Sequence, residues 1–288
     1  MKYRTVLVTG ASSGIGKATA SHIASMGGTV VMLCRDQRRG ELAREEIRRQ
    51  IIDEGKDTAR FGSLELAICD LGSLDSIDEF AGAFLDRYPE LHVLVNNAGV
   101  YSRRRRETAD GLELHFGVNY VGHFYLTYLL LPRLREMGAA RVINVTSAAH
   151  EHGRIHFRDL QLQRLYTPRK AYAQSKLANI LFTRELKRRV SDTSITTNSV
   201  DPGRVATRLG IDRSTGIGML RARVRRLALP TPFQGAMAVI RQAVDPDVAQ
   251  TNGQHFIGFH RADPSRRAQS TDTARRLWEA TEELLALG

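Results

Sequence analysis

The most constraining feature of the sequence is an alternation, from the first residues to the last, of short apolar runs with longer segments of helical spacing. Several of the short runs are apolar throughout, as strands are in a sheet that is covered on both faces. The alternation predicts βαβ units and hence an α/β fold: a doubly wound parallel sheet of about seven strands with helices on both faces. The expected strands are Thr5–Thr9, Thr29–Leu33, Leu64–Ile68, Val93–Asn96, Arg141–Val145, Ile195–Val200 and Gln254–Ile257. The expected helices are Ile15–Met26, Arg38–Glu54, Ser73–Tyr88, Gly111–Met137 and Ala171–Val190.

A chain of 288 residues suits one domain of this kind, and no internal repeat or low-complexity linker interrupts the pattern. The least regular stretch follows the sixth expected strand and combines glycines and prolines with an Arg-rich segment. A long insertion at this place is typical of a loop that covers a substrate. We therefore predict a single domain over residues 1–288, with a substrate lid around 204–232 and a C-terminal helical tail over 265–288.

Positive charge raises an alternative function. The chain has 42 Lys and Arg residues against 31 Asp and Glu, a formal net charge of +11 at pH 7, and six of the 42 are Lys, so 36 are Arg. The densest basic run is Arg103–Arg106. A nucleic-acid-binding protein would show such a balance, but no recognisable binding module accompanies the run. We therefore interpret it as a solvated loop and expect no nucleic-acid partner.

The sequence also bears on the compartment. The longest apolar stretch, Phe124–Leu131, has eight residues, far short of the roughly 20 that a membrane-spanning helix needs. The N-terminus runs into the first expected strand without the apolar segment of a signal peptide. The two cysteines, Cys34 and Cys69, have no CxxC partner. We expect reduced thiols, no membrane span and a cytoplasmic location.

A glycine cluster lies between the first expected strand and the first expected helix. It runs Thr9-Gly10-Ala11-Ser12-Ser13-Gly14-Ile15-Gly16, a GxxxGxG spacing. Glycines at such a place let the strand turn sharply and let the backbone approach a pyrophosphate, whose charge lies at the helix N-terminus. A tight turn alone would also explain them, but the position between strand and helix favours a dinucleotide. The predicted cofactor-binding residues here are Gly10, Ser12, Ser13, Gly14, Ile15 and Gly16.

The end of the second expected strand indicates which nicotinamide cofactor is used. Folds that bind NAD place an acid here for the adenosine ribose hydroxyls, whereas this chain has Cys34 at the aligned position and Arg35 directly after it. A guanidinium suits a 2′-phosphate. We therefore predict NADP(H) as cofactor, with Asp36 as the residue that would favour NAD(H) instead.

Two further segments fit a dinucleotide. Asp70 and Leu71, after the third expected strand, would contact the adenine, although Asp70 equally suits the approach to a helix that is capped at Ser73. The turn Asn96–Gly99, after the fourth strand, brings small residues to a place where backbone passes close to the cofactor. The predicted contacts in this turn are Asn97, Ala98 and Gly99.

Tyr172 and Lys176 carry the strongest chemical signal. Their i, i+4 spacing places the phenol and the ammonium on one helix face. A cation beside the hydroxyl favours the phenolate, so we expect the pKa of Tyr172 to fall from about 10 toward the working pH. Alone, such a pair is common on helix surfaces.

In combination these residues resemble the short-chain dehydrogenase/reductase family, which implies a Rossmann fold. The resemblance covers nearly the whole chain. It rests on Gly10, Gly14, Gly16, the Asn96–Gly99 turn, Asn119, Ser147, Tyr172, Lys176 and Asp201-Pro202-Gly203, which occur in the family's order. Three stretches are similar to the retinol dehydrogenase branch, namely Ala109–Asn119, His150–Leu160 and Ser175–Leu186. Many enzymes of that branch carry a hydrophobic N-terminal anchor, which this sequence does not show, so we expect a soluble relative.

The resemblance implies a role for each residue at the reacting end. Tyr172 would be the general acid that protonates the carbonyl oxygen as hydride arrives, or the base in the reverse direction. Lys176 would lower the pKa of Tyr172 and hold the nicotinamide ribose. Ser147 would donate a hydrogen bond to the substrate oxygen, so Ser147 and Tyr172 would bind the substrate. Asn119 would orient a water that links Lys176 to solvent. The further cofactor contacts implied are Pro202 and Gly203 beside the nicotinamide, and Thr207 at the carboxamide or the pyrophosphate.

The segment between Ser147 and Tyr172 is longer than the family's commonest spacing. It contains His150, His152 and His156. Because no carboxylate or cysteine pair completes a ligand pattern, we predict no metal site. We interpret the segment as a surface loop near the substrate mouth, as in the retinol dehydrogenase branch.

These inferences predict an NADP(H)-dependent oxidoreductase acting on CH–OH groups, a carbonyl reductase that interconverts a ketone or aldehyde and an alcohol. Apolar residues between Leu209 and Leu227 either contact a fairly large hydrophobic substrate or pack the lid on the core. One alternative is a ketoreductase that tailors a polycyclic polyketide. Another is a protein that senses NADP(H) without chemistry, although such relatives tend to lose the catalytic Tyr or Lys. The expected partner is a small carbonyl or alcohol molecule. The sequence itself neither supports nor excludes a homo-oligomer of the kind that relatives often form.

Overall fold

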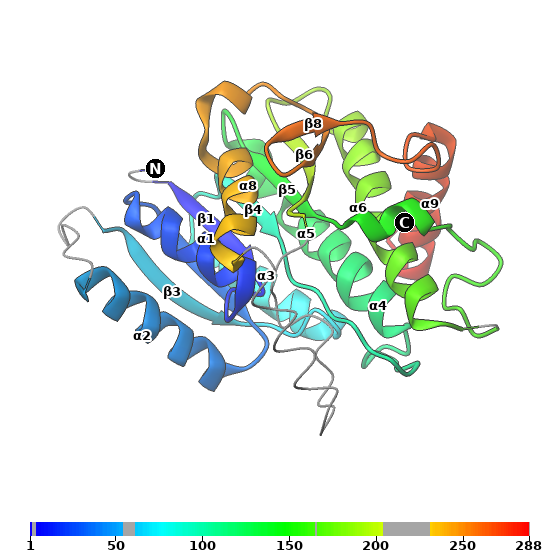
Figure 1. Cartoon of the computed structure of the whole chain (residues 1–288), viewed down its shortest axis with the longest axis horizontal. Coiled ribbons are helices and arrows are strands. Elements are labelled where there is room, and N and C mark those ends of the chain that lie inside the picture. Colours follow the sequence, from blue (N-terminus) through cyan, green and yellow to red (C-terminus); the bar gives the residue numbers. More distant parts are fainter. Residues whose placement is uncertain (2–3, 54–60, 165, 204–230, 288) are drawn as a thin grey trace.

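The structure of the chain is a computed structural model that describes residues 1, 4–53, 61–164, 166–203 and 231–287. Its described residues form an eight-stranded sheet in the order β3-β2-β1-β4-β5-β6-β7-β8, parallel throughout except between β7 and β8. The doubly wound fold is confirmed, with one more strand than expected. Figure 1 shows the sheet with helices on both of its faces. The strands are β1 (Thr5–Thr9), β2 (Thr29–Cys34), β3 (Ser63–Ile68), β4 (Val93–Asn96), β5 (Arg141–Val145), β6 (Thr196–Asp201), β7 (His255–Ile257) and β8 (His260–Ala262).

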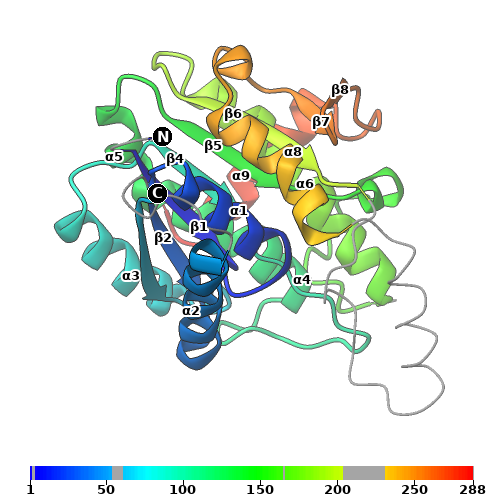
Figure 2. The same cartoon turned by 60° about the vertical axis from the view of Figure 1, so that its left-hand side comes forward.

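Side chains of the parallel strands alternate between two apolar cores, because successive residues of a strand point to opposite faces of the sheet. In β1, Val6 and Val8 belong to one core and Leu7 to the other. Helices α1, α2 and α8 cover the first core, while α3, α5, α6 and α9 cover the second. Figure 2 shows α1 and α8 side by side over their face of the sheet. Because helices cover both faces of the sheet, a ligand can approach it at the carboxyl ends of the strands.

The helices agree with the expected segments except in one region and at the C-terminal side. The α-helices are α1 (Gly14–Ser25), α2 (Gln37–Asp53), α3 (Leu74–Arg87), α4 (Leu114–Phe116), α5 (Gly122–Glu136), α6 (Pro168–Arg189), α8 (Pro232–Val244) and α9 (Thr271–Leu284). A π-helical turn, η2 (Gly117–Val121), joins α4 to α5, and the short 3-10 helices are η3 (Ala148–His152) and η4 (Pro246–Val248). Helix α8 was not predicted, whereas α9 lies within the expected helical tail.

The single helix expected over Gly111–Met137 is wrong, because the chain there is divided. The side chain of Glu113 accepts a hydrogen bond from the backbone N–H of Phe116, so helix begins only at that cap. The π-helical turn follows, and its end is marked by the backbone N–H of Gly122, which donates to the carbonyl of Gly117. A Cβ at Gly122 would collide with the carbonyl oxygen of Leu71, so glycine lets α5 pass the loop after β3.

Helix α9 closes the second core. The ring of Trp278 packs on Phe124 of α5, with ring centroids 4.6 Å apart, and stacks on Phe182 of α6. The hydroxyl of Thr281 is 2.8 Å from the hydroxyl of Tyr120 in η2. The C-terminal helix therefore supports the turn that carries Asn119. No helix in the described part of the chain is long and apolar enough to cross a bilayer.

Candidate active site

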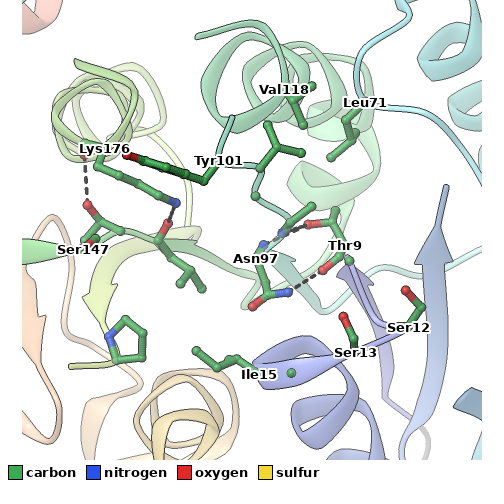
Figure 3. Close-up of a pocket in the computed structure, with 18 of the residues that line it drawn as sticks. Thr9, Ser12, Ser13, Ile15, Leu71, Asn97, Tyr101, Val118, Ser147 and Lys176 are labelled. Carbon is green, nitrogen blue, oxygen red and sulfur yellow. Dashed lines mark hydrogen bonds between the residues drawn. The ribbon is translucent and has the colours of Figure 1, made fainter. Parts of the chain in front are cut away.

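A cleft of about 880 Å³ runs along the carboxyl ends of the strands, over the point where the strand order reverses between β1 and β4. This is where doubly wound sheets bind ligands. Figure 3 shows Thr9 and Asn97 on one side of the cleft and Ser147 and Lys176 on the other. The predicted site residues that line it are Gly10, Ser12, Ser13, Gly14, Ile15, Arg35, Asp70, Leu71, Asn97, Ala98, Gly99, Ser147, Tyr172, Lys176, Pro202 and Gly203. Gly16 and Asn119 are buried behind this lining, and Thr207 and residues 204–230 of the predicted lid lie outside the described residues.

The glycine turn after β1 is shaped by close backbone approach. Gly10 and Gly14 have φ of +66° and +60°, a conformation that favours glycine. A Cβ at Gly16 would lie 2.5 Å from the carbonyl oxygen of Gly10 and would also collide with the side-chain nitrogen of Asn97. Ser13 precedes α1 in an extended conformation, and its side chain makes no capping hydrogen bond among the described residues. The first residues of α1, Gly14 and Ile15, line the cleft without a side-chain cap, as a pyrophosphate site requires.

The hydroxyl of Thr9 joins this turn to the turn after β4. Its oxygen accepts hydrogen bonds from the backbone N–H groups of Asn97 and Ala98, both at 2.8 Å. The side-chain nitrogen of Asn97 donates back to the carbonyl of Thr9, also at 2.8 Å (Figure 3). The two turns thus form one rigid wall of the cleft.

The end of the cleft beside β2 carries two guanidinium groups. Arg35 and Arg39 both line it, and Cys34, at the end of β2, is 2% exposed. Burial raises the pKa of the Cys34 thiol to about 11, so it stays uncharged. The carboxylate of Asp36 accepts a hydrogen bond from the backbone N–H of Arg39 at 2.8 Å. The Asp36 carboxylate is therefore engaged in a hydrogen bond at the start of α2. Arg39 also lines the cleft, although it was not predicted from the sequence.

The segment after β3 both lines the cleft and leads into a capped helix; its contact with an adenine stays a prediction. The Asp70 carboxylate lines the cleft and accepts from the N–H of Gly72 at 2.9 Å. Ser73 caps α3 by accepting from the N–H of Ser76. The turn that leads into the helix is therefore also the floor of the cleft at this end.

Ser147, Tyr172 and Lys176 come together at the other end. Lys176 is 3% exposed, and its ammonium donates to the carbonyl of Val145 at 3.1 Å. The hydroxyl of Ser147 lies close enough to the phenol of Tyr172 to oppose the rise in its pKa. Burial lowers the pKa of Lys176 to about 8, against the nearby carboxylate of Asp201, which raises it. The group thus combines a phenol, a hydroxyl and a buried amine around one point.

The expected fall in the pKa of Tyr172 is wrong for this arrangement. Burial raises the pKa of Tyr172 to about 12, the hydroxyl of Ser147 opposes the rise, and the nearby Asp201 and Tyr101 add to it. The ammonium of Lys176 lies 5.8 Å from the centre of the phenol ring and is directed at Val145. Removal of water from the hydroxyl therefore outweighs the effect of the cation.

Asn119 holds the loop after β4 against helix α6. Its side-chain oxygen accepts from the N–H of Val100 at 2.7 Å, and its nitrogen donates to the carbonyl of Val100 and to the hydroxyl of Ser175. The Ser175 hydroxyl in turn donates to the carbonyl of Tyr172 at 2.8 Å. Asn119 thus fixes the positions of two cleft walls from behind.

Tyr101 and Asp201 are site residues to which the sequence reading gave no role. The ring of Tyr101 meets the ring of Tyr172 edge to face, with centroids 5.5 Å apart. Asp201 is 3% exposed, lines the cleft and accepts from the N–H of Gly203 at 2.8 Å. Asp201 is the last residue of β6, and this position at a strand end was the available signal for it, whereas Tyr101, in the loop after β4, had none.

His150, in the longer segment before Tyr172, forms hydrogen bonds with the protein's own backbone. His150 is buried, with Nδ1 2.9 Å from the carbonyl of Ser147 and Nε2 accepting from the N–H of Ser265 at 3.3 Å. Among the described residues, no group of three His, Cys, Asp or Glu is placed to hold a metal ion. His150 instead supports the turn that presents Ser147.

Comparison with known proteins places this geometry in a family. A family model described as short chain dehydrogenase matches residues 4–217. The chain belongs to the short-chain dehydrogenase family. It is 42% identical to human retinol dehydrogenase 11 over 284 residues, which cover 99% of this chain and 86% of that protein. It is 39% identical to mouse retinol dehydrogenase 14 over 293 residues, covering 100% of this chain and 87% of the relative. The protein is accordingly an oxidoreductase that acts on CH–OH groups, similar to retinol dehydrogenases.

Solved structures of the family show the same fold. An uncharacterised protein of Mycobacterium paratuberculosis superposes with a TM-score of 0.78 at 33% identity, covering 99% of this chain and 94% of that one. A protein of Beutenbergia cavernae described as an NAD(P)-dependent gluconate 5-dehydrogenase, with NADP bound at low occupancy, has a TM-score of 0.66 at 25% identity. The superposition covers 89% of this short-chain dehydrogenase and 95% of the Beutenbergia cavernae chain.

Substitution of Gly16 tests the packed turn. Gly16→Ala is expected to lower the free energy of unfolding by about 1–3 kcal/mol and to weaken NADPH binding, because the new methyl must displace the Gly10 carbonyl and the Asn97 amide. Urea denaturation followed by circular dichroism and NADPH titration would measure both. Gly82→Ala, in the exposed middle of α3 where a Cβ meets nothing, is the control and should raise stability by about 0.5–1 kcal/mol. Wild-type stability and affinity in Gly16→Ala would contradict the prediction.

Proposed function

We propose that the protein is an NADP(H)-dependent carbonyl reductase that interconverts a large hydrophobic aldehyde or ketone and its alcohol. The observation that carries the proposal is the convergence of Ser147, Tyr172 and Lys176 at the end of a cleft whose other end is lined by Arg35 and Arg39. The retinol dehydrogenases to which the chain is similar support a hydrophobic alcohol or aldehyde as substrate.

The residues present fit a phosphorylated dinucleotide. Gly10 and Gly14 of the glycine turn line the cleft, and the start of α1, which has no side-chain cap, offers backbone donors for the pyrophosphate. Arg35 and Arg39 supply positive charge where a 2′-phosphate would lie, and no acid competes at Cys34. When bound, the cofactor supplies the hydride, and the protein supplies position and electrostatics.

In reduction, Tyr172 donates its phenolic proton to the carbonyl oxygen, and Ser147 donates a hydrogen bond to the same oxygen as negative charge develops there. The raised pKa of Tyr172, about 12, keeps the proton on the phenol at neutral pH. Lys176, buried beside them, provides the positive charge that stabilises the phenolate once the proton has left. The arrangement therefore supports reduction of a carbonyl at neutral pH.

The substrate class follows from the apolar side of the cleft. Tyr101 and Ile257 both line the cleft. The side chain of Ile257 is 43% exposed. Figure 3 shows the ring of Tyr101 between the labelled Lys176 and Val118, and this ring meets that of Tyr172. An apolar wall of this kind favours a hydrophobic body on the carbonyl compound, such as that of a retinoid.

Cofactor preference is tested by removing the guanidinium groups. Arg35→Ala is expected to raise the dissociation constant of NADPH about 10- to 100-fold by loss of a charge-assisted hydrogen bond, and to leave that of NADH within about twofold. Fluorescence titration of both cofactors measures this. Arg48→Ala, on the exposed face of α2, should change neither constant. Equal initial rates of the wild type with NADH and NADPH would contradict the assignment.

Activity is tested with all-trans-retinal and a panel of ketones and aldehydes in the presence of NADPH. The wild type should reduce the large hydrophobic members, and Tyr172→Phe should lower kcat about 10²- to 10⁴-fold while NADPH affinity stays within about twofold. Turnover retained in Tyr172→Phe would exclude the acid role. A wild type that binds NADPH but reduces no member of the panel would support the cofactor-sensing alternative instead.

The rate of reduction is expected to fall as the pH rises through about 8. The pKa of Lys176 lies below its ordinary value, so its charge is present below about pH 8 and is lost above it, whereas Tyr172 keeps its proton across this range. A profile of kcat against pH measures the fall. In Lys176→Arg the charge persists, so the alkaline fall should move well above this pH even though kcat is lower. An unmoved fall in that variant would assign it to another group.

A further inference from the structure

His123 lies in α5 behind the cleft, where the proposed mechanism does not use it. The residue is 1% exposed, and each ring nitrogen contacts a residue of the site. Nε2 is 2.9 Å from the hydroxyl oxygen of Thr9, and Nδ1 is 3.0 Å from the main-chain carbonyl oxygen of Asn119. The imidazole of His123 therefore links Thr9, which joins the turns after β1 and β4, to the π-helical turn that carries Asn119.

Hydrogen-bond counting fixes the proton on the imidazole. The carbonyl of Asn119 can only accept, so Nδ1 carries the hydrogen. The hydroxyl oxygen of Thr9 already accepts from two backbone N–H groups, those of Asn97 and Ala98, which uses its two lone pairs. Its one hydrogen has two acceptors within reach, Nε2 of His123 at 2.9 Å and the carbonyl of Val95 at 3.3 Å. A neutral ring that carries its hydrogen on Nδ1 leaves Nε2 as an acceptor, and the shorter contact then takes the Thr9 hydrogen. The imidazole is neutral, with its hydrogen on Nδ1.

The surroundings keep the imidazole neutral. Burial lowers the pKa of His123 to about 4, and the positive charge of Lys176 lowers it further, against the hydrogen bond to Asn119. A protonated ring would place a third donor on Thr9 and a second buried cation near Lys176. The tautomer is thus set by the same buried groups that form the site.

The main chain at Asn119 is also unusual. The residue lies in the π-helical turn η2, where the N–H of Gly122 donates to the carbonyl of Gly117, five residues earlier. Such turns interrupt the regular pairing of carbonyls within a helix and are frequent at functional sites. The side chain of His123 reaches back one turn to the Asn119 carbonyl, so it holds this part of the turn in place.

We propose that His123 is a positioning residue, whose neutral imidazole couples the placement of Asn119 behind Tyr172 to the placement of the Asn97 and Ala98 turn at the cofactor. The chain of bonds runs from these backbone N–H groups through the Thr9 hydroxyl and the imidazole to Asn119, and on through the Asn119 side chain to Ser175 and the carbonyl of Tyr172. The catalytic part of this inference rests on the proposed function.

Two conservative substitutions separate the two bonds. The amide nitrogen of an asparagine occupies the place of Nδ1, so His123→Asn keeps the donor to Asn119 and loses the acceptor for Thr9. The amide oxygen of a glutamine occupies the place of Nε2, so His123→Gln keeps that acceptor and loses the donor to Asn119. We expect His123→Asn to raise the dissociation constant of NADPH about 5- to 10-fold with kcat within about twofold. We expect His123→Gln to lower kcat about 5- to 10-fold with NADPH affinity within about twofold.

Thr281→Val is the matched control. It removes the hydrogen bond between Thr281 and Tyr120, which supports the same π-helical turn from the side of α9, away from the cleft. It should lower the temperature of unfolding and leave NADPH affinity and kcat within about twofold. Parallel losses of affinity and kcat in both His123 variants, in proportion to their loss of thermal stability, would overturn the proposal, as would wild-type values in both.

A measurement without cofactor or substrate separates this inference from the proposed function. The ¹⁵N spectrum of the histidine rings, with the His123 signals assigned by their absence in His123→Gln, should show a protonated Nδ1 and an unprotonated Nε2 at neutral pH. A protonated Nε2 would overturn the proposal even if the enzyme reduces retinal. Inactivity of the wild type toward every carbonyl compound, with this tautomer present and the effect of His123→Asn on NADPH binding retained, would instead count against the proposed function alone.

Discussion

The hydroxyl of Thr9 is the group on which the geometry of the site depends. β1 and β4 are neighbours in the sheet, but the strands that follow them along the chain lie on opposite sides of this pair, so the two turns diverge at this point. The oxygen of Thr9 holds the turn after β4 through two backbone N–H groups, and the side chain of Asn97 returns a third bond to the carbonyl of Thr9. With both strands buried on two faces, an unpaired N–H group here would cost about 1–3 kcal/mol. The cleft therefore opens where the chain segments after β1 and β4 diverge. The hydrogen bonds between Thr9 and the turn after β4 hold the base of the cleft together.

Burial of charge is the second constraint, and it acts at the reacting end. The pKa of Lys176 is lowered and that of Asp201 is raised, both chiefly by loss of water, although each group stabilises the charge of the other. Desolvation thus outweighs attraction for both members, which is common for buried ions that lack a direct contact. A lysine in this state loses its proton close to neutral pH, and a tyrosine beside the carboxylate keeps its own. The pH range in which phenol and ammonium coexist is the range in which the group can donate a proton and stabilise what remains.

Most of the fold could be predicted from the sequence, because strands buried on two faces and helices with one apolar face leave a periodic pattern. The division of the segment before α5 could not, since it depends on the side-chain cap at Glu113 and on the close passage of Gly122 over the Leu71 carbonyl. Helix α8 buries small residues against α1, a contact that no local pattern reveals. In the site, motif residues at strand ends were found, while Arg39 and Tyr101 reach the cleft only through the fold. The pKa of Tyr172 was mispredicted because the spacing to Lys176 carries no information about solvent.

Of the four consecutive arginines, three are exposed, as expected of a solvated loop, whereas Arg105 has a structural role. Arg105 is partly buried, pairs with Glu107 at 2.6 Å and donates to the carbonyl of Gln161, in the segment that lengthens the spacing between Ser147 and Tyr172. The side chain of Gln161 accepts in turn from the N–H of Glu113 at 2.6 Å. The carboxylate of Glu113 is fully buried and accepts from Nδ1 of His115, whose ring packs edge to face on Tyr101. The loop after β4, the lengthened segment and the start of α4 are therefore one hydrogen-bonded unit behind the aromatic wall. A chain that shortened the segment would leave the buried carboxylate of Glu113 and the ring of Tyr101 without this support, so the extra residues before Tyr172 belong to the architecture of the site rather than to its surface.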